Sequence, residues 1–449
     1  MRVLKFGGTS VGSADRINEV IDLLEQRKEE QIVVLSAMSG TTNDLVQISS
    51  TIRDGRREEA AQLLDEFEDK YVRVLTDLYV RKDDRDTARD LIRPCVTMIR
   101  EMLGQSSPFT EVNDREICAQ GELISTRLFS HMCDIRGIQT ALIPALNFIS
   151  LNQQGEPDLE RIEKDIQPYL DLIDEDCKIL ITQGYICRDH EGQVTNLKRG
   201  GSDYTATIIG SVVRASEVQI WTDIDGVHNN DPRIVQHTSP IRKLSYREAA
   251  ELAYFGAKIL HPTCVLPVEV AKVPLRLKCT MEPDALGTLI SEEPSLLPVT
   301  AIASKSGIIA LEIRSHRMLN AYGFLTQVFQ VFEKYRTSVD MITTSEVSVS
   351  LTIEDDSFLD AIIDELGQIA EVEVTQNHAI VCIVGNALYE DNRYVKEIFG
   401  LLEDIPIRMV SLGGSRHNIS VLIPQEDRAK ALQNLHSLFL TTIKSLENA

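Results

Sequence analysis

The stretch that decides the fold is KFGGTSVG at residues 5–12, which directly follows the apolar pair Val3-Leu4. A short strand here runs into a lysine, two adjacent glycines and two hydroxyl side chains, and a helical pattern begins near Ser13. Paired glycines let backbone N–H groups approach an anion closely, and the N-terminus of the following helix adds a partial positive charge. Lys5 can reach the same anion with a full charge. The stretch predicts a polyphosphate-binding strand–loop–helix unit, or else a plain strand–turn–helix whose glycines serve only the turn.

This loop differs from the Walker A loop, in which a Lys-Ser/Thr pair follows the glycines. The lysine here precedes them. The sequence also lacks the HExxH zinc motif, the GxGxxG dinucleotide fingerprint and the motifs of a Ser/His/Asp triad. Phosphate handling is therefore the chemistry that the paired glycines favour.

Length and charge narrow the class of protein. At 449 residues the chain is long enough for two or three domains, and its 43% of hydrophobic residues supports real cores. A net charge of −22 argues against nucleic-acid binding, which needs a basic surface. An acidic chain that binds anionic substrates has to concentrate particular lysines and arginines in a cleft, because its overall field repels such ligands.

Signals for membranes or secretion are missing from the sequence. No apolar run approaches the roughly 20 residues that a membrane-spanning helix needs, and Met1-Arg2 leads straight into a strand rather than a signal peptide. The eight cysteines form no CxxC pair or zinc-finger spacing. We therefore expect reduced, mostly packed thiols and a cytoplasmic protein.

Residues 1–290 alternate strand and helix patterns, as a mostly parallel α/β sheet does. Strands beyond the first are expected at 31–38, 140–143, 178–182 and 218–221. Residues 45–103 indicate a cap of charged helices. Ligands of such open sheets bind beyond the carboxyl ends of the strands. The candidate loops are therefore those after Lys5, Leu35, Thr182 and Trp221.

The pattern changes at SEEPSLLP, residues 291–298, which we interpret as a linker. Beyond it a small α+β unit occurs twice, about 70 residues apart. Its helix and strands are expected within 328–353 and again within 398–423. The C-terminal part is therefore predicted to contain a pair of related modules.

A second glycine pair occurs in KRGGSDYT at residues 198–205 and again opens a helix pattern. Arg199 can clamp a carboxylate or phosphate through two parallel N–H bonds, and Ser202 is a donor at the start of the helix. Asp203 is either an N-cap or an active-site carboxylate. Two Gly-Gly loops, each with a cation and each opening a helix, favour a site that transfers an anionic group.

Several other polar residues have an ordinary structural interpretation when taken alone. Glu122 follows a glycine near the start of a helix pattern and is expected to face solvent, unless a substrate ammonium must be held. Lys258 is typical of a cation that complements a helix C-terminus, and His261 before a proline is typical of a packed loop. Asp231-Pro232-Arg233, in contrast, places a rigid turn before an arginine suited to a phosphate.

Taken in order, these motifs resemble those of the aspartate kinases (aspartokinases) in the amino acid kinase family. The N-terminal half carries the resemblance in KFGGTSVG at 5–12, LSAMSGTTN at 35–43, GEL at 121–123, RGGSDYTA at 199–206, WTDIDG at 221–226, DPR at 231–233 and FGAKILHP at 255–262. The C-terminal half adds GFL at 323–325 and SVDMITTSEVSVSLT at 338–352. The resemblance covers essentially the whole chain.

The resemblance implies a fold and an activity. The fold is an α/β amino acid kinase domain at 1–290, with a mostly parallel sheet between helices, followed by two α+β ACT domains of ferredoxin-like type. The first ACT domain (315–380) would be inserted in the second (299–314 and 381–449), so that residues 300–313 return to the strands after Val381. The activity is phosphorylation of the side-chain carboxylate of L-aspartate by ATP with Mg²⁺. Its product, 4-phospho-L-aspartate, leads toward lysine, threonine and methionine.

Roles of individual residues are implied in the same way. Lys5 and Asp203 would be catalytic, Lys5 stabilising the transferring γ-phosphoryl together with Gly7 and Gly8, and Asp203 organising Lys5 or the metal. The aspartate pocket would contain Ser36, Thr42, Glu122, Arg199 and Ser202, with Glu122 facing the ammonium and Arg199 a carboxylate. The nucleotide would be held by Thr222, Asp223, His228, Arg233 and Lys258. The metal ligands stay unassigned, and no general base is needed because the substrate carboxylate is already ionised.

The ACT domains would form a homodimer and bind a feedback effector. By resemblance the effector site contains Met318, Ala321, Gly323, Phe324, Leu325, Val339, Asp340, Thr344, Ser345 and Glu346. The sequence is most similar to the monofunctional, lysine-inhibited form, with threonine as the other candidate effector. It departs from that form at two positions. Ala321 stands where such relatives commonly carry a serine, which removes a possible donor to the effector, and His228 stands where many carry a tyrosine.

Two other functions are the alternatives. A different amino acid kinase, acting on acetylglutamate or carbamate, would lack the C-terminal repeat and would have no use for Glu122. A non-catalytic amino-acid sensor built from ACT domains would not need Lys5, Arg199 and Asp203. Both are therefore disfavoured by residues that this sequence contains.

Overall fold

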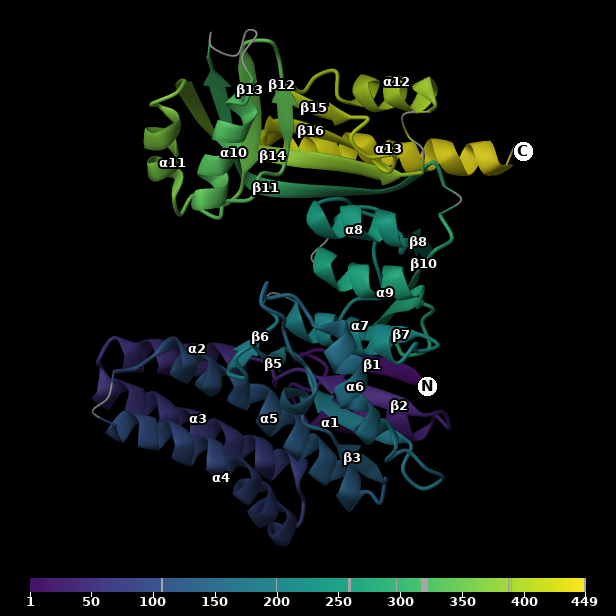
Figure 1. Cartoon of the computed structure of the whole chain (residues 1–449). Helices are drawn as coiled ribbons and strands as arrows, with labels where there is room; N and C mark the ends of the chain where they lie inside the picture. Colours follow the sequence, from purple (N-terminus) through teal and green to yellow (C-terminus); the bar gives the residue numbers. More distant parts are fainter. Residues whose placement is uncertain are drawn as a thin grey trace. The chain divides into compact units, whose positions relative to one another are not determined.

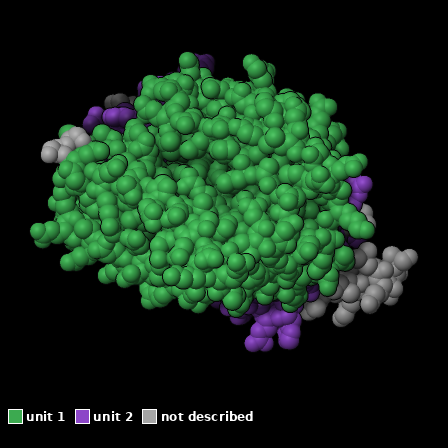
Figure 2. Space-filling view, turned by 90° about the horizontal axis from the view of Figure 1, so that it is seen from below, with its two compact units in different colours: residues 1–227, 260–292 green, residues 228–259, 293–449 purple. Residues whose placement is uncertain are grey.

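The computed structural model falls into two compact units, which Figure 2 colours separately. Unit 1 consists of Met1–Val227 and Leu260–Glu292, and unit 2 of His228–Ile259 and Glu293–Ala449. The residues that the structure describes are 1–105, 108–198, 200–256, 260–295, 297–315, 322–386, 388 and 390–447. Each unit has a sheet and a hydrophobic core of its own.

Unit 1 is built on a mostly parallel sheet, drawn in Figure 1. Its strands lie in the order β3-β4-β2-β1-β7-β9-β10. Their bounds are β1 Arg2–Phe6, β2 Gln31–Leu35, β3 Thr140–Leu142, β4 Ile179–Gln183, β7 Val218–Thr222, β9 Leu275–Cys279 and β10 Thr288–Ser291. All neighbouring pairs are parallel except β9 and β10, which are antiparallel. The strands predicted from the apolar runs are therefore confirmed.

The central strands are apolar because helices cover both faces of such a sheet. Every residue of β2 and β4 is buried, and so are four of the five residues of β1. The register sets Lys5 beside Val34 of β2 and Ile220 of β7. Lys5 is thereby fixed near the carboxyl end of a central strand, where the first glycine loop begins.

Helices surround this sheet, and α2–α5 pack on one another as a helical cap beside it (Figure 1). The bounds are α1 Ala14–Glu25, α2 Thr41–Arg53, α3 Arg57–Leu78, α4 Lys82–Gly104, α5 Glu111–Ile135, α6 Leu159–Leu170, α7 Gly201–Val212 and α9 Val265–Ala271. A short hairpin is formed by β5 Ile186–Arg188 and β6 Val194–Asn196. In α1 the predicted apolar stripe is buried, and Ser13 caps the helix by accepting from the backbone N–H of Arg16. One core joins the cap helices to the sheet.

Unit 2 contains a six-stranded antiparallel sheet with the strand order β12-β13-β11-β14-β16-β15. The strands are β11 Val299–Arg314, β12 Ile342–Thr344, β13 Ser348–Ile353, β14 Glu371–Gly385, β15 Met409–Leu412 and β16 Asn418–Pro424. The helices are α10 Phe324–Lys334, α11 Leu359–Leu366, α12 Asn392–Leu401 and α13 Arg428–Glu447. This is the repeated α+β unit that the sequence predicts, with α10 and α12 in corresponding places.

The two repeats share the long strands β11 and β14, which pair along almost their whole length. Residues 309–314 of β11 pair with β13, and α10 and α11 cover this half with a core of its own. Residues 378–384 of β14 pair with β16, and α12 and α13 belong to the core of the other half. The predicted return of 300–313 to the strand after Val381 is confirmed for residues 301–304, which pair with 381–384, whereas residues 305–313 pair with residues 372–380 of β14, ahead of Val381.

The segment 228–259 belongs to unit 2, although it precedes the linker predicted at 291–298. It contains β8 Lys243–Ser245 and α8 Tyr246–Tyr254. The buried carboxylate of Glu248 accepts hydrogen bonds from the backbone N–H of Ser295 and from the hydroxyl of Thr300. These contacts hold α8 on β11 and explain why the compact units depart from chain order. The domain boundaries given above remain a proposal.

Two expectations from composition bear on the environment of the chain. All eight cysteines are free thiols, and seven of them are buried. Burial raises the pKa of most of these thiols, for example that of Cys264 to about 12, which keeps them protonated and unreactive. The prediction of reduced, packed cysteines is confirmed. Among the described residues no helix is long and apolar enough to cross a membrane.

Candidate active site

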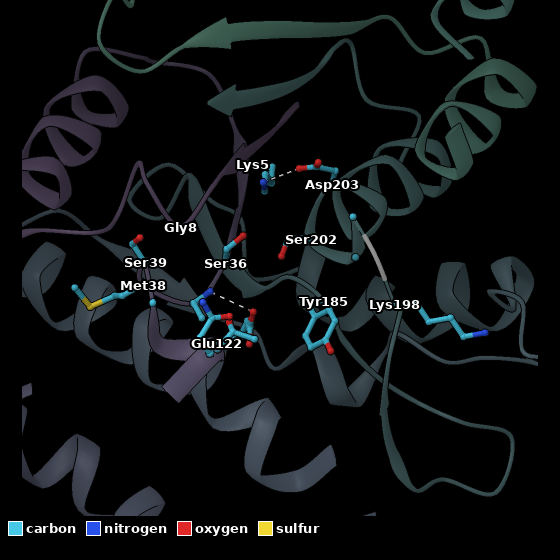
Figure 3. A pocket seen from close by; sticks show the side chains of 16 residues that line it. Lys5, Gly8, Ser36, Met38, Ser39, Glu122, Tyr185, Lys198, Ser202 and Asp203 are labelled. Carbon is cyan, nitrogen blue, oxygen red and sulfur yellow. Dashed lines mark hydrogen bonds and ion pairs between the residues drawn. The ribbon is translucent and has the colours of Figure 1, made fainter. Parts of the chain in front are cut away.

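A cavity of about 610 Å³ in unit 1 opens at the carboxyl ends of β1 and β2, where open α/β sheets bind their ligands (Figure 3). Its walls come from the end of β1 and the loop after it, the loop after β2 with the start of α2, the middle of α5, the residues that follow β4 and β6, and the start of α7. Its lining residues are Lys5, Gly8, Ser36, Ala37, Met38, Ser39, Gly40, Thr42, Asn43, Glu122, Tyr185, Lys198, Gly200, Gly201, Ser202 and Asp203. Both predicted glycine loops therefore meet in one cavity.

The first glycine loop requires its glycine because of a close approach. A Cβ atom on Gly8 would lie 2.9 Å from the carbonyl oxygen of Ala37 in the loop after β2. The loop is held from the other side by the N–H of Gly7, which donates to the carbonyl oxygen of Trp221. A side chain at Gly8 would push the two loops apart. Because glycine has none, the loops approach closely and the floor of the cavity stays narrow.

Lys5 and Asp203 form an ion pair inside the cavity, with 2.6 Å between Nζ and Oδ1. Their side chains are 11% and 15% exposed, so water screens the pair only partly. Asp203 lies in the first turn of α7, whose N-cap is Gly200 and not an acidic side chain. The N-cap interpretation of Asp203 is therefore wrong, and its active-site interpretation fits the geometry. The pair orients the Lys5 ammonium toward the space between the loops.

The second glycine loop also needs both of its glycines. Gly200 has a φ of +72°, and a Cβ atom there would lie 2.7 Å from Cβ of His261. A Cβ on Gly201 would lie 2.7 Å from the ring of Tyr185. The first backbone N–H groups of a helix have no acceptor within it, so the start of α7 adds partial positive charge to this wall.

Glu122 lies in the middle of α5 and is only 3% exposed. The expectation that it faces solvent near a helix start is wrong, because α5 begins eleven residues earlier at Glu111, where Thr110 and Asn113 form a capping box. Its Oε1 accepts a hydrogen bond of 3.2 Å from the N–H of Ala37. Among the described residues no donor reaches Oε2.

Burial raises the pKa of Glu122 to about 7, although the hydrogen bond from Ala37 opposes the shift. A buried carboxylate with one unpaired oxygen in a cavity is costly unless a cation neutralises it. Glu122 is therefore suited to a ligand ammonium group. In the view of Figure 3, Ser36 and Ser202 lie between Glu122 and the Lys5–Asp203 pair, so the cavity has two chemically different ends.

Sequence reasoning missed a contact that supports this arrangement. The hydroxyl of Ser125, one turn after Glu122 on α5, donates to the carbonyl oxygen of Ser36 at 2.8 Å. Together with Glu122 it fastens both sides of one peptide group in the loop after β2, the C=O of Ser36 and the N–H of Ala37, to α5. The spacing of Glu122 and Ser125 along one helix face is the signal that could have found it.

Other lining residues were also missed, namely Ala37, Met38, Ser39, Gly40, Asn43, Tyr185 and Lys198. The first five lie in the LSAMSGTTN motif, from which only Ser36 and Thr42 were assigned to the site. Tyr185 and Lys198 have positive φ angles of 66° and 59°. Such a strained backbone could not be predicted from the residue pattern. Lys198 adds a second lysine to the cavity wall.

The residues predicted to hold the nucleotide do not gather in this cavity as the predicted aspartate residues do. Thr222 ends β7 and Asp223 follows it in unit 1, and neither belongs to the described lining of the cavity. His228 and Arg233 belong to unit 2. There His228 contacts the hydroxyl of Thr238, and Arg233 makes two 3.0 Å contacts with Asp231. Arg199 and Lys258 lie outside the described residues.

Met318 and Ala321 of the predicted effector residues lie outside the described residues, and the others belong to the half of unit 2 that contains α10 and β13. Gly323 caps α10 with a φ of 85°, ahead of the buried Phe324 and the half-exposed Leu325. Val339 packs on the core of this half, and Thr344, Ser345 and Glu346 span the turn between β12 and β13. Asp340 is nearly buried and accepts from Lys305 Nζ at 3.0 Å and from the hydroxyl of Tyr254 at 2.9 Å.

Within the described part of the chain, no group of three or more His, Cys, Asp or Glu residues is arranged to hold a metal ion. The cavity contains two carboxylates, Glu122 and Asp203, of which the second is paired with Lys5. A divalent cation at this site would take most of its oxygens from a phosphate ligand and from water.

Comparison with known proteins decides the family. Residues 1–279 match the model of the amino acid kinase family, and residues 381–439 match that of an ACT domain. The chain is 35% identical to the lysine-sensitive aspartokinase 3 of Escherichia coli over 452 residues, which cover 97% of this chain and 98% of that protein. The chain belongs to the aspartokinases. The family predicted from the ordered motifs is thus confirmed.

Solved aspartokinase structures agree with this assignment. This aspartokinase is similar to E. coli aspartokinase III in complex with aspartate and ADP, with a TM-score of 0.83 and 33% identity over 98% of this chain and 100% of that one. It is also similar to the same enzyme in complex with lysine and aspartate, with a TM-score of 0.78 and 34% identity over 97% and 99% of the two chains. The predicted fold class, an amino acid kinase domain followed by ACT domains, is confirmed.

Proposed function

We propose that this aspartokinase transfers the γ-phosphoryl group of ATP to the side-chain carboxylate of L-aspartate and forms 4-phospho-L-aspartate. The observation that carries the proposal is the cavity of unit 1, in which the Lys5–Asp203 pair, two glycine loops and the half-satisfied Glu122 come together. The complex of E. coli aspartokinase III with aspartate and ADP supports it.

Aspartate would lie at the end of the cavity that contains Glu122. The unpaired Oε2 of Glu122 receives its ammonium group, which supplies the neutralising charge that the buried carboxylate lacks. The hydroxyls of Ser36, Thr42 and Ser202 are donors for its carboxylates. Arg199, which lies outside the described residues, is proposed to clamp the α-carboxylate, consistent with its place beside Gly200. Acetylglutamate and carbamate carry no free ammonium, so Glu122 disfavours the alternative kinases.

The phosphoryl group would pass between this end and the Lys5 end. A side-chain oxygen of aspartate attacks the γ-phosphorus, the bond from the γ-phosphorus to the bridging oxygen breaks, and ADP leaves with that oxygen. Lys5, the backbone at Gly7 and Gly8 and the start of α7 stabilise the charge on the transferred group. Asp203 keeps Lys5 in place. The attacking carboxylate is already ionised, so no side chain has to remove a proton.

The nucleotide would be held by Thr222, Asp223, His228, Arg233 and Lys258. Arg233 is paired with Asp231, so phosphate binding by Arg233 would have to compete with that carboxylate. Mg²⁺ would arrive with ATP and neutralise its phosphates, with Asp203 as the carboxylate available beside them in the cavity.

Regulation by lysine is the second part of the proposal. The lysine complex of E. coli aspartokinase III supports lysine as the effector of the predicted site around α10 and β12. The ACT halves of two chains would form the homodimer. Calorimetry on the purified chain tests this part: heat of binding with lysine is expected, and heat with threonine alone would contradict it.

Steady-state release of ADP tests the catalytic part. The chain with MgATP is expected to release ADP with L-aspartate and not with N-acetylglutamate or carbamate. Lys5→Ala is expected to lower kcat by a factor of about 10²–10³, the size typical of losing one charge-stabilising group. Lys28→Ala, at an exposed lysine, serves as the matched control. Undiminished turnover in Lys5→Ala would remove Lys5 from the mechanism.

A further inference from the structure

A second cavity, of about 310 Å³, lies between α3 and α4 in the helical cap. Within the described part of unit 1 it shares no lining residue with the first cavity. Its lining residues are Glu68, Tyr71, Val72, Leu75, Arg89, Ile92, Arg93, Val96, Thr97 and Arg100. We infer that this groove binds a small organic anion with an apolar body, and that Tyr71 connects it to the loop after β2.

The floor of the groove is apolar. Tyr71 and Leu75 of α3, together with Ile92 and Val96 of α4, are each at most 5% exposed. The volume is at the small end of the range for ligand pockets, so it accommodates one ring or a short aliphatic chain. An apolar body of that size gains free energy by displacing water from this floor.

The rim selects a negative charge. Three arginines and a single carboxylate line the groove, in a chain whose net charge is −22. Arg89 and Arg93 are four residues apart on α4, so they emerge on the same face of the helix. Two guanidinium groups at this spacing can hold one carboxylate or phosphate between them.

The existing partners of these two arginines are weak. Arg93 pairs at 2.8 Å with Asp90, and Arg89 lies 4.0 Å from Asp86, both acids being on α4 itself. The side chains of Arg93 and Arg89 are 67% and 53% exposed, and exposed pairs of this kind contribute little. Arg100 differs in having its partners on the other helix, α3, where it pairs with Asp65 at 2.7 Å and with Glu68 at 2.9 Å. Arg89 and Arg93 are therefore the groups available to a ligand.

Tyr71 extends from the floor of the groove to the end of the loop after β2. Its hydroxyl forms a buried hydrogen bond of 2.9 Å with Oγ1 of Thr41, the first residue of α2. Thr41 lies between Gly40 and Thr42, which both line the first cavity. The preceding residue of α3, Lys70, pairs with Asp44 at 2.7 Å, so α3 holds the start of α2 at two points.

A ligand in the groove would contact the ring of Tyr71 and, through it, bias the position of Thr41. The effect would appear in the binding of aspartate, a readout that rests on the proposed function. The binding event itself does not, because it can be measured without any substrate.

Calorimetry with the full chain, without nucleotide or aspartate, tests the site. The probe is 3-phenylpropanoate, and its uncharged amide is the matched control. Saturable binding of the carboxylate is expected, with at least tenfold weaker binding of the amide. The double variant Arg89→Gln/Arg93→Gln is expected to lose at least tenfold in affinity, whereas Arg73→Gln, at an exposed arginine of α3 outside the groove, should bind normally. Equal affinity for the amide, or unchanged affinity in the double variant, would overturn the assignment.

The connection through Tyr71 is tested separately. A saturating concentration of the probe is expected to change the KM for aspartate at least twofold in the unmodified chain and in Arg73→Gln. Tyr71→Phe keeps the ring and loses the hydroxyl, so it should still bind the probe while its KM no longer responds. An unchanged KM in the parent chain, or an equal response in Tyr71→Phe, refutes the connection. A chain that binds the probe but phosphorylates no aspartate would refute the proposed function and leave the groove intact as a site.

Discussion

Glu122 in unit 1 and Asp340 in unit 2 are both nearly buried carboxylates in predicted amino-acid sites, yet their surroundings differ. Each carboxylate has one oxygen without a hydrogen-bond partner among the described residues, and the other oxygen of Glu122 accepts only from the backbone N–H of Ala37. Asp340 accepts from Lys305 and from Tyr254, and Lys305 is also paired with Glu354. The first carboxylate lacks a cation and the second has one of its own. In the proposed roles, the substrate site takes its neutralising cation from the ligand, whereas the effector site contains its own.

The difference is also visible in the acid–base properties of the two sites. Burial raises the pKa of Glu122 to about 7. For Lys305, burial lowers the pKa, but hydrogen bonds and attraction from Glu354 and Asp340 outweigh it and the net shift is upward. The first site therefore titrates near neutral pH, and the second keeps its cation charged.

The largest effect is expected from Glu122→Gln. Glutamine keeps an acceptor for Ala37 but cannot neutralise an ammonium, so kcat/KM for aspartate should fall about 100-fold, the loss expected for a charge-assisted hydrogen bond in a buried site. The thermal midpoint should not fall, because the substitution removes a costly buried charge. Steady-state kinetics and calorimetric melting measure both, with the exposed Glu111→Gln on the same helix as control. Normal catalysis in Glu122→Gln would show that the unpaired oxygen has no role.

Lys305→Met removes the internal cation of the second site and makes it resemble the first. The nearly buried Asp340 carboxylate would keep only Tyr254, and the free energy of unfolding should fall by about 2 kcal/mol, the cost of leaving a buried acceptor without its partner. Lysine, if it binds there, should restore more stability to this variant than to the parent chain. Urea denaturation with and without lysine is the measurement. Lys334→Met breaks the exposed Lys334–Glu365 pair of the same unit and should cost little. Equal losses in the two variants would contradict the comparison.

The pH dependence follows from the raised pKa of Glu122. Below pH 7 the free enzyme carries a protonated Glu122, so kcat/KM for aspartate should fall roughly tenfold between pH 8 and pH 6. The free energy of unfolding changes in the opposite direction. A carboxyl whose pKa is raised in the folded state takes up a proton as the pH falls through that pKa, and this stabilises the folded chain. The parent chain should gain about 1.4 kcal/mol relative to Glu122→Gln between pH 8 and pH 6. Parallel stability curves for the two proteins would show that Glu122 does not titrate in this range.

The smallest effect is expected from Tyr254→Phe. It removes one hydrogen bond to Asp340 and leaves the Lys305 ion pair in place, so the unfolding free energy should drop by about 1 kcal/mol. Chemical denaturation compares it with Tyr322→Phe, at a fully exposed tyrosine. A loss as large as that of Lys305→Met would mean that the tyrosine, and not the lysine, satisfies Asp340.

Local patterns were enough to predict much of this architecture. The apolar run before Lys5, the paired glycines and the helical pattern that begins near Ser13 define a strand, a loop and a helix within twenty-five residues, and all three are present. The C-terminal repeat was likewise evident from the spacing of its apolar residues. Such features depend on neighbours along the chain, which a single sequence displays directly.

Features set by distant partners were not predictable in this way. Glu122 was expected near a helix start because the cap at Thr110 has Asn113 in place of the usual Glu or Gln and gives no familiar signal. Asp340 meets Lys305 and Tyr254 across 35 and 86 residues of sequence. The apparent N-cap at Asp203 likewise turned into an ion pair with Lys5, nearly two hundred residues earlier. Contacts with residues distant in the sequence determine the surroundings of each of these side chains.

The shared strands β11 and β14 have a mechanical consequence. Both ACT halves contain parts of β11 and β14, so neither half has a complete sheet of its own. Removing one half would leave the other with unpaired strand edges. The two halves should consequently melt in one concerted transition. The pairing of β11 with β14 is interrupted only by register irregularities between Val299 and Ala301 and between Ser306 and Ala310, so a twist introduced at one end of the ribbon should be transmitted along it except at these points.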